Sequence, residues 1–279
     1  MSFVRLRPAV AALAALLVVC GLIVAPAPAS AAGVDAVRSA LAREFRAAGG
    51  LSGAYARDLS AQSGTELIAV REDRPRIPAS VDKLFVTATA LLRFGPTGRL
   101  TTRAVTDAEI EQDGTLNGNV WLVGGGDPAL DEGDLRQLAA AVRGAGVRRV
   151  TGDVLGDDTA FDRLRGGPRT GYAPDHDLGG RLGALVMSHG SQPDPATYVA
   201  RRFRSHLREA NVTVAGVAAT GKAPDGAPEL GTVGSAPIGD LVRQINVPSD
   251  NYAADMLLKA LGSVYGDGGT TTGGATVVR

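Results

Sequence analysis

Apolar positions recur every three or four residues in several stretches of the chain, which is the spacing of one face of a helix. The stretch that follows Ser80 has apolar residues at positions 81, 84, 85, 88, 91 and 92, so it predicts a buried helix that ends at Gly95-Pro96. The other predicted helices are residues 34–48, 134–142 and 252–261, of which the last is closed by Gly262.

Shorter apolar runs bounded by turn residues predict strands. They are residues 51–59, 67–70, 119–123 and 150–155. The first two are expected to form a hairpin through Ser63-Gly64. Segments 166–174 and 221–234 are rich in glycine and proline, so they predict surface loops or boundaries. The pattern as a whole predicts a mixed α and β protein with short elements.

The first thirty residues have the layout of an export signal. Arg5 and Arg7 precede an apolar run over residues 9–24, and Ala29-Ser30-Ala31 offers small residues for cleavage. We therefore expect a secretory signal peptide over residues 1–31, a mature chain outside the cytoplasmic membrane, and no stable membrane span after cleavage. A retained anchor is the alternative, because the apolar run is only slightly shorter than the roughly 20 residues that span a bilayer.

Composition excludes several classes of function. The chain has 29 basic and 29 acidic residues, and this balance argues against a general nucleic-acid binder. The single cysteine, Cys20, lies in the signal segment, so the mature chain has no thiol nucleophile, disulfide or Cys-ligated zinc. His176, His189 and His206 stand in no metal-ligand spacing, and no serine lies in a G-x-S-x-G elbow. We expect neither a metal nor a cofactor.

Ser80 and Lys83 form the first motif with catalytic potential. Residues at i and i+3 share one face of a helix, so this spacing brings the hydroxyl close to the amine. Lysine can act as the base for a serine nucleophile if burial and neighbouring charges keep the amine neutral. Lysine is scarce in this chain, which adds weight to the pair. The structural alternative is a helix-capping serine beside a solvated lysine.

Ser249-Asp250-Asn251 forms the second motif, directly before the predicted helix 252–261. A hydroxyl and a carboxamide on one loop could relay a proton to a leaving amine and hold a substrate amide. Ser, Asp and Asn also favour helix caps, so a purely structural cap is the alternative.

Several short segments occur in an order that is more specific than any one of them. They are Pro78-Ala79-Ser80 with Lys83, Phe94-Gly95-Pro96, residues 122–128, residues 152–161, Ala184-Leu185 and Ser249-Asp250-Asn251. Over residues 51–262 the chain resembles the exported, penicillin-binding D-alanyl-D-alanine carboxypeptidases and endopeptidases that carry a large insertion between their first two motifs. The resemblance implies that Ser80 is acylated, Lys83 is the base, Ser249 relays the proton and Asn251 binds the substrate. It implies peptidoglycan stem peptides and β-lactams as ligands.

The resemblance also implies an α+β architecture. Ser80 and Ser249 are 169 positions apart, so we expect a transpeptidase- or β-lactamase-like domain made from residues 32–101 and 241–279, with a mixed α/β domain inserted at residues 102–240. The family completes its site with a Lys-Thr-Gly strand, whereas Thr271-Thr272-Gly273 lacks the lysine and is expected to be a loop. We therefore expect a C-terminally truncated member with an incomplete sheet and impaired activity.

Two alternatives belong to other classes. Gly124-Gly125-Gly126 after a strand could be a dinucleotide loop, but a third spaced glycine is absent and Asp127 would put a negative charge beside the phosphate. The stronger alternative is a catalytically silent cell-wall-binding or scaffold protein. Labelling with a penicillin separates that protein from an enzyme.

Overall fold

A computed structural model of the protein describes residues 34–59, 65–174 and 176–279. The predicted signal peptide and the Ser63-Gly64 turn lie outside the described residues. The chain forms two compact units, Met1–Ile77 and Pro78–Arg279, which are described separately. The domain boundaries expected from the sequence remain a prediction.

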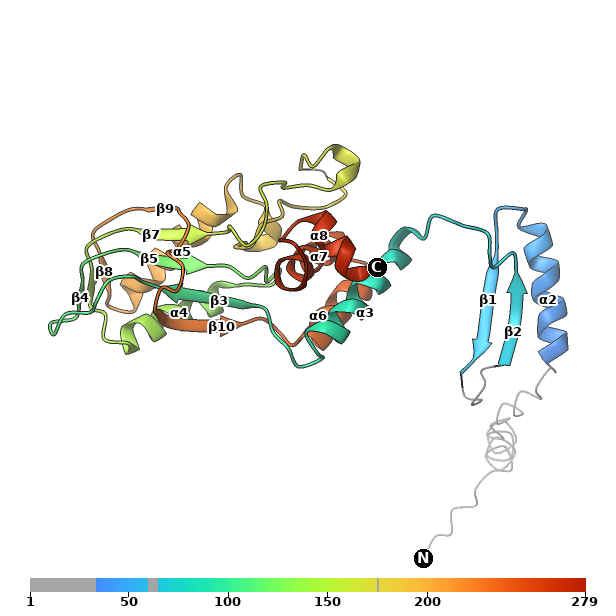
Figure 1. Ribbon diagram of the computed structural model, residues 1–279, viewed down its shortest axis with the longest axis horizontal. Coiled ribbons are helices and arrows are strands. Elements are labelled where there is room, and N and C mark those ends of the chain that lie inside the picture. Colours follow the sequence, from blue (N-terminus) through green and yellow to red (C-terminus); the bar gives the residue numbers. More distant parts are fainter. Residues whose placement is uncertain (1–33, 60–64, 175) are drawn as a thin grey trace, which may run out of the picture. The chain divides into compact units, whose positions relative to one another are not determined.

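The first unit is a helix beside a two-stranded antiparallel sheet (Figure 1). Its elements are α2 (Val34–Ala47), β1 (Ala54–Asp58) and β2 (Thr65–Val70). The helix and both strands confirm the sequence prediction. The Arg71 guanidinium donates hydrogen bonds to the carbonyls of Phe45, Gly49 and Ser52 at 3.0, 2.9 and 2.7 Å, so one side chain fixes the end of α2 to the start of the hairpin.

The second unit contains a five-stranded sheet in the order β10-β3-β5-β7-β9. Strands β5, β7 and β9 run parallel, while β3 and β10 are antiparallel to their neighbours. The strands are β3 (Thr101–Val105), β5 (Val120–Val123), β7 (Val154–Asp157), β9 (Ala218–Thr220) and β10 (Glu229–Gly234). A small parallel sheet adds β4 (Thr115–Leu116), β6 (Arg149–Val150) and β8 (Thr213–Val214).

Two helices pack on this sheet and enclose its core. Helix α4 (Glu132–Gly144) contacts β10 and β3, and α5 (Pro195–Glu209) contacts β7, β9 and α4. The core between them is fully apolar and includes Leu122, Leu138 and Phe203, each with no exposed surface. The alternation of buried and exposed residues along α4 agrees with the helix predicted at residues 134–142.

Four helices gather at one end of the sheet (Figure 1). They are α3 (Lys83–Arg93), α6 (Ile238–Asn246), α7 (Asn251–Tyr265) and α8 (Thr271–Val278). Helix α7 lies at the centre of a second apolar cluster and has nine buried residues. Helix α8 corrects the loop expected around Thr271-Thr272-Gly273. It packs so closely on α7 that a side chain at Gly262 would not fit: a Cβ there would lie 2.6 Å from the Gly274 nitrogen.

Helix α3 is less buried than its apolar pattern predicts. Its described buried residues are the small side chains Thr87 and Ala90, which face α6 and α7. Four large apolar side chains are between 52% and 85% exposed: Val81 shortly before the helix, and Leu84, Phe85 and Leu92 on the helix itself. The prediction of a helix is confirmed, and one side of it packs on the second apolar cluster through Val86, Ala90 and Leu91. Periodicity identifies an apolar face without identifying what covers it.

Three other boundaries differ from the sequence prediction. The strand expected at residues 150–155 is divided between β6 and β7, which belong to different sheets. Gly152 lies between them, and a Cβ there would lie 2.5 Å from the Gly118 carbonyl oxygen, so the two backbones approach closely at this point. Strand β10 occupies part of the segment expected to be a loop at 221–234. Helix α7 continues past Gly262, since that glycine permits the close approach of α8 and does not end the helix.

The Gly124-Gly125-Gly126 loop has a packing role. A Cβ at Gly124 would lie 2.2 Å from the Ala184 carbonyl oxygen, and one at Gly125 would lie 2.4 Å from the Thr101 carbonyl oxygen. Neighbouring backbone therefore leaves no room for a side chain at either position.

Candidate active site

Ser80 lies in a short 3₁₀ turn, η1 (Ala79–Asp82), directly before α3. The preceding Ala79 has φ +50°, a left-handed conformation that non-glycine residues seldom adopt and that is often found at functional sites. Ser80 is exposed at the amino end of α3. The turn therefore presents the hydroxyl to solvent where the helix dipole favours a developing negative charge.

Lys83, the first residue of α3, lies between two hydroxyl groups. Its Nζ donates a hydrogen bond to Ser80 Oγ at 3.2 Å and another to Ser249 Oγ at 3.3 Å. The i, i+3 spacing accounts for the first contact. The second contact joins residues 166 positions apart, so only the tertiary fold can form it.

Ser249 lies in the turn between α6 and α7, with φ +62°. The turn is held against α3 because Asn246 Nδ2 donates a hydrogen bond to Thr87 Oγ1 at 3.2 Å. A backbone hydrogen bond from Asp250 N to Ile245 O, 2.9 Å long, closes the turn. These contacts direct the Ser249 hydroxyl toward Lys83.

Asn251 is the first residue of α7 and is exposed. Its Nδ2 donates to the backbone carbonyl of Asp177 at 2.9 Å. The preceding Asp250 caps the helix, since its Oδ1 accepts from the Ala253 backbone nitrogen at 3.0 Å. Asp250 is therefore the residue of this motif that caps α7. The Ser249 hydroxyl does not cap the helix and contacts Lys83 instead.

A cavity of about 410 Å³ joins the two motifs. Ser80, Lys83 and Asn251 line it together with groups that the sequence reasoning did not select. Those additional groups include Asp82, Gly167, Arg169, Asp177 and Asp255. The four predicted site residues therefore lie at one place: three line this cavity and Ser249 contacts Lys83. Their catalytic roles remain predictions.

Arg169 and Asp177 form an exposed ion pair at this cavity. Arg169 belongs to the short helix η2 (Pro168–Thr170), within the segment that the sequence predicts to be a surface loop. The signal that could have identified the pair is a basic residue inside the Gly- and Pro-rich segment and an acidic residue shortly after it, but loop charges are common on any surface.

An ion pair with a buried lysine lies further along α7. Lys259 on α7 is 1% exposed, and its Nζ donates to Asp162 Oδ1 at 2.6 Å and to the Leu164 carbonyl at 2.8 Å. Because the same helix begins at Asn251, this pair joins the element that carries the second motif to the segment leading to η2. Among the described residues no group of three or more His, Cys, Asp or Glu side chains could hold a metal ion.

A lysine amine shared by two serine hydroxyls is an arrangement suited to acyl transfer through a serine nucleophile. The chain matches the D-Ala-D-Ala carboxypeptidase 3 (S13) family over residues 30–177 and 185–279. These ranges cover most of the chain, which therefore belongs to that family.

Two curated relatives share this similarity. A D-alanyl-D-alanine carboxypeptidase from Actinomadura sp. is 32% identical over 170 residues, which are 60% of this chain and 29% of the relative. A carboxypeptidase from Mycobacterium tuberculosis is 30% identical over 249 residues, which are 82% of this chain and 51% of the relative. The matched region thus spans about half or less of the length of these relatives.

The fold is that of a solved penicillin-binding protein. The chain aligns with penicillin binding protein 4 from Haemophilus influenzae with a TM-score of 0.64 and 18% identity, covering 77% of this chain and 63% of that one. A second structure of the same protein, complexed with a β-lactam, aligns with a TM-score of 0.60 over 86% of this chain and 68% of that one. The predicted α+β, penicillin-binding-protein fold is confirmed.

Proposed function

We propose that this protein is a serine-type D-Ala-D-Ala carboxypeptidase or endopeptidase that acts on peptidoglycan peptides through an acyl-enzyme on Ser80. The observation that carries the proposal is the position of Lys83 Nζ, 3.2 Å from Ser80 Oγ and 3.3 Å from Ser249 Oγ. One amine can therefore take a proton from one hydroxyl and pass a proton toward the other.

In the first half of the proposed reaction, Ser80 Oγ attacks the carbonyl carbon of the terminal D-Ala-D-Ala peptide bond. The Lys83 amine takes the Ser80 proton as the new C–O bond forms. The C–N bond then breaks, and Ser249 passes a proton from Lys83 to the departing amine of D-alanine. The products are an ester on Ser80 and free D-alanine.

In the second half, water attacks the ester carbonyl carbon and the ester bond to Ser80 Oγ breaks. A proton from the water returns to Ser80 Oγ, and the shortened peptide leaves with a free carboxyl group. Asn251 has one amide hydrogen bond to the Asp177 carbonyl and lies on the cavity wall, so its position suits contact with a substrate amide. The Arg169–Asp177 pair supplies opposite charges at the same cavity. Such groups can orient a peptide that has both charged and amide groups.

The proposed location is the cell envelope, outside the cytoplasmic membrane. The basic and apolar pattern before Ala29-Ser30-Ala31 supports export. No helix in the part of the chain that the structure describes is long and apolar enough to cross a membrane. The relatives named as D-alanyl-D-alanine carboxypeptidases support a peptidoglycan peptide as substrate, and the Haemophilus complex supports β-lactam binding.

Mass spectrometry after incubation with benzylpenicillin tests the proposal. We expect an adduct of one penicillin on Ser80, its loss in Ser80→Ala, and its retention in Ser191→Ala, which changes an exposed serine elsewhere. An adduct that persists in Ser80→Ala would refute the assignment. A complete lack of adduct together with binding to purified peptidoglycan would favour the silent wall-binding protein.

Lys83→Arg tests the role of the lysine amine. Arginine is positively charged at ordinary pH and cannot accept the Ser80 proton. We therefore expect acylation of Ser80 to be abolished while the thermal unfolding temperature stays close to that of the wild type. Comparable acylation rates of the two proteins across a pH series would show that Lys83 is not the base.

A further inference from the structure

His189 occupies a strained turn near the second motif. The turn is the short helix η3 (Ser188–Gly190), in which both Ser188 and His189 have positive φ values, +51° and +54°. Two consecutive non-glycine residues in this conformation are unusual and persist only where the surrounding structure imposes them.

The surrounding backbone imposes this conformation. Arg181 N donates to the Gly190 carbonyl at 3.1 Å, and Gly190 N donates to the Met187 carbonyl at 2.9 Å. A Cβ at Gly180 would lie 1.7 Å from the His189 carbonyl oxygen, so the neighbouring segment packs directly against the turn. The backbone of the His189 turn is therefore held by the neighbouring segment and by its own closing hydrogen bond.

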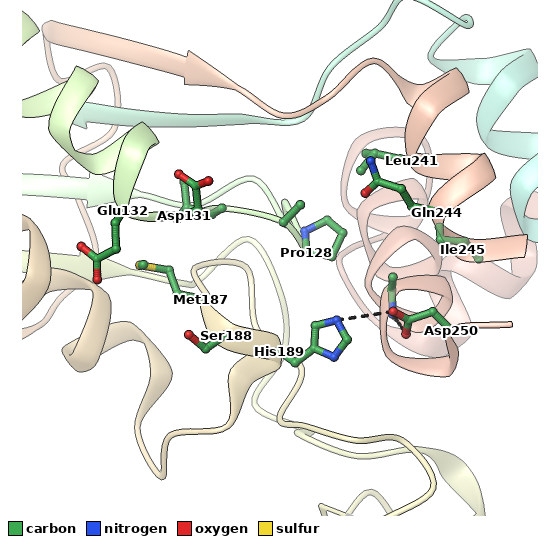
Figure 2. Close-up of a pocket in the computed structure, with 13 residues that line it drawn as sticks. Pro128, Asp131, Glu132, Met187, Ser188, His189, Leu241, Gln244, Ile245 and Asp250 are labelled. Atoms are coloured by element: carbon green, nitrogen blue, oxygen red, sulfur yellow. Dashed lines mark hydrogen bonds and ion pairs between the residues drawn. The ribbon is translucent and has the colours of Figure 1, made fainter. Parts of the chain in front are cut away.

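The imidazole ring is directed toward Asp250, as Figure 2 shows. Its Nε2 lies 3.4 Å from Asp250 Oδ2, and the ring stacks on Tyr252 with centroids 4.8 Å apart and planes 25° apart. Burial raises the pKa of the Tyr252 phenol, which stays neutral and donates to the Arg181 carbonyl at 3.3 Å. The stacking surface beneath the imidazole is thus itself held in place.

Asp250 is the residue between Ser249 and Asn251. One carboxylate oxygen accepts from Ala253 N, and the other faces His189. The carboxylate is consequently held both by α7 and by the turn of the neighbouring segment. The Asp250 side chain is 22% exposed, whereas that of His189 is 54% exposed, and both line a cavity of about 370 Å³ separate from that of Ser80.

From this geometry we infer that His189 is a positioning residue for the Ser249 turn: it holds Asp250 so that the Ser249 hydroxyl stays in contact with Lys83 Nζ. The effect on catalysis rests on the proposed function, while the effect on the turn does not. His189 does not line the Ser80 cavity in the described structure, so it acts through Asp250. The residue is one of the three histidines that stand in no metal-ligand spacing in the sequence.

Amide hydrogen exchange tests the effect on the turn without requiring activity. The variant is His189→Asn, because asparagine accepts a left-handed conformation but its shorter side chain carries no imidazole. We expect the amides of Asp250 and Ala253 to exchange about tenfold faster, because Asp250 then loses the imidazole that lies 3.4 Å from its Oδ2. The matched control is His176→Asn, an exposed histidine in another loop, which should leave these rates unchanged.

The variant Asp250→Asn completes a double-mutant cycle. Asparagine keeps an oxygen that can cap α7 but removes the carboxylate that faces His189. If His189 acts through Asp250, the double variant should exchange no faster than the faster single variant. Unchanged exchange in His189→Asn, or additive effects in the double variant, would overturn the inference.

Benzylpenicillin acylation then separates positioning from a general loss of structure. We expect His189→Asn to lower the maximal acylation rate about tenfold with little change in the penicillin concentration at half-maximal rate. A weaker penicillin affinity with an unchanged maximal rate would contradict positioning of Ser249. If the wild-type protein forms no adduct, the proposed function fails, and the exchange experiment alone still decides the role of His189.

Discussion

The sheet region and the helical region of the second unit are built on different principles. In the sheet region, formed by β3, β5, β7, β9 and β10 with α4 and α5, the large apolar side chains are enclosed, as for Leu138 and Phe203. In the helical region, formed by α3, α6, α7 and α8, α7 is buried but the outer side of α3 is open. The four candidate site residues all belong to the helical region.

The difference shows that the enclosed core stabilises the fold, while the candidate reactive groups lie at helix ends and turns. A closed apolar core can hold elements rigidly but leaves no place for water or a peptide. Helix ends and turns expose polar groups that a substrate can reach. Lys83, Ser249 and Asn251 lie at such ends, while the buried Lys259–Asp162 pair fixes the helix behind them.

The largest expected effect compares one phenylalanine from each region. Phe203→Ala removes a side chain with no exposed surface, so we expect the free energy of unfolding to fall by about 3–5 kcal/mol. Phe85→Ala removes a side chain that is 58% exposed on α3, and we expect a change within about 0.5 kcal/mol. Urea denaturation measures both. Equal losses would mean that the outer side of α3 is covered in solution.

The next effect tests whether the helical region has its own internal anchor. Lys259→Ala leaves the Asp162 carboxylate without its buried partner, and we expect a loss of about 3 kcal/mol. The control is Lys222→Ala, which removes a 63% exposed lysine paired with Asp225 and should cost less than about 1 kcal/mol. A loss at Lys259 no larger than at Lys222 would show that the buried pair does not hold the region together.

A pH-dependent effect is expected in the sheet region. Burial raises the pKa of Asp127 from 3.8 to about 6, so the folded state favours the protonated carboxyl. This contribution to stability is complete below pH 4 and is lost as the pH rises through about 6. The loss amounts to about 3 kcal/mol, at about 1.4 kcal/mol for each pKa unit between the folded and unfolded states.

Asp127→Asn isolates that contribution. Asparagine stays neutral and keeps an oxygen for the hydrogen bond that Asp127 accepts from the Ala129 nitrogen at 2.9 Å. We therefore expect the variant to lose less stability than the wild type between pH 4 and pH 7 in urea denaturation. Identical pH dependences would show that Asp127 is not the responsible group.

The smallest effect compares helix caps of the two regions. Asp131 accepts from the backbone nitrogens of Gly133 and Asp134 at the start of α4, and Thr270 accepts from Gly273 at the start of α8. Alanine at either position should lower the free energy of unfolding by about 1 kcal/mol. Thermal unfolding of both variants tests whether the caps are equivalent; a negligible loss at Thr270 would indicate that α8 depends on its packing against α7.

The elements that the sequence predicted well are those whose signals are local. The helix at residues 34–48 and the strand at 119–123 have the right periodicity and clear turn residues at their ends. Helix α8 was missed because Thr271 to Gly274 are poor helix formers, and its close contact with α7 requires the glycines that suggested a loop. Tertiary packing outweighed local propensity there.

For the site, the sequence by itself determined which polar side chains are available and that Ser80 and Lys83 contact each other. The Ser80–Lys83 spacing places amine and hydroxyl on one helical turn, and Asp250 before α7 supplies a cap in any fold that keeps that helix. Only the tertiary structure decided that Ser249, 166 residues from Lys83, would share its amine, that Arg169 and Asp177 would meet at the same cavity, and that His189 would face Asp250. Local spacing constrains positions within one turn, whereas contacts between distant segments depend on how the enclosed cores orient the helices.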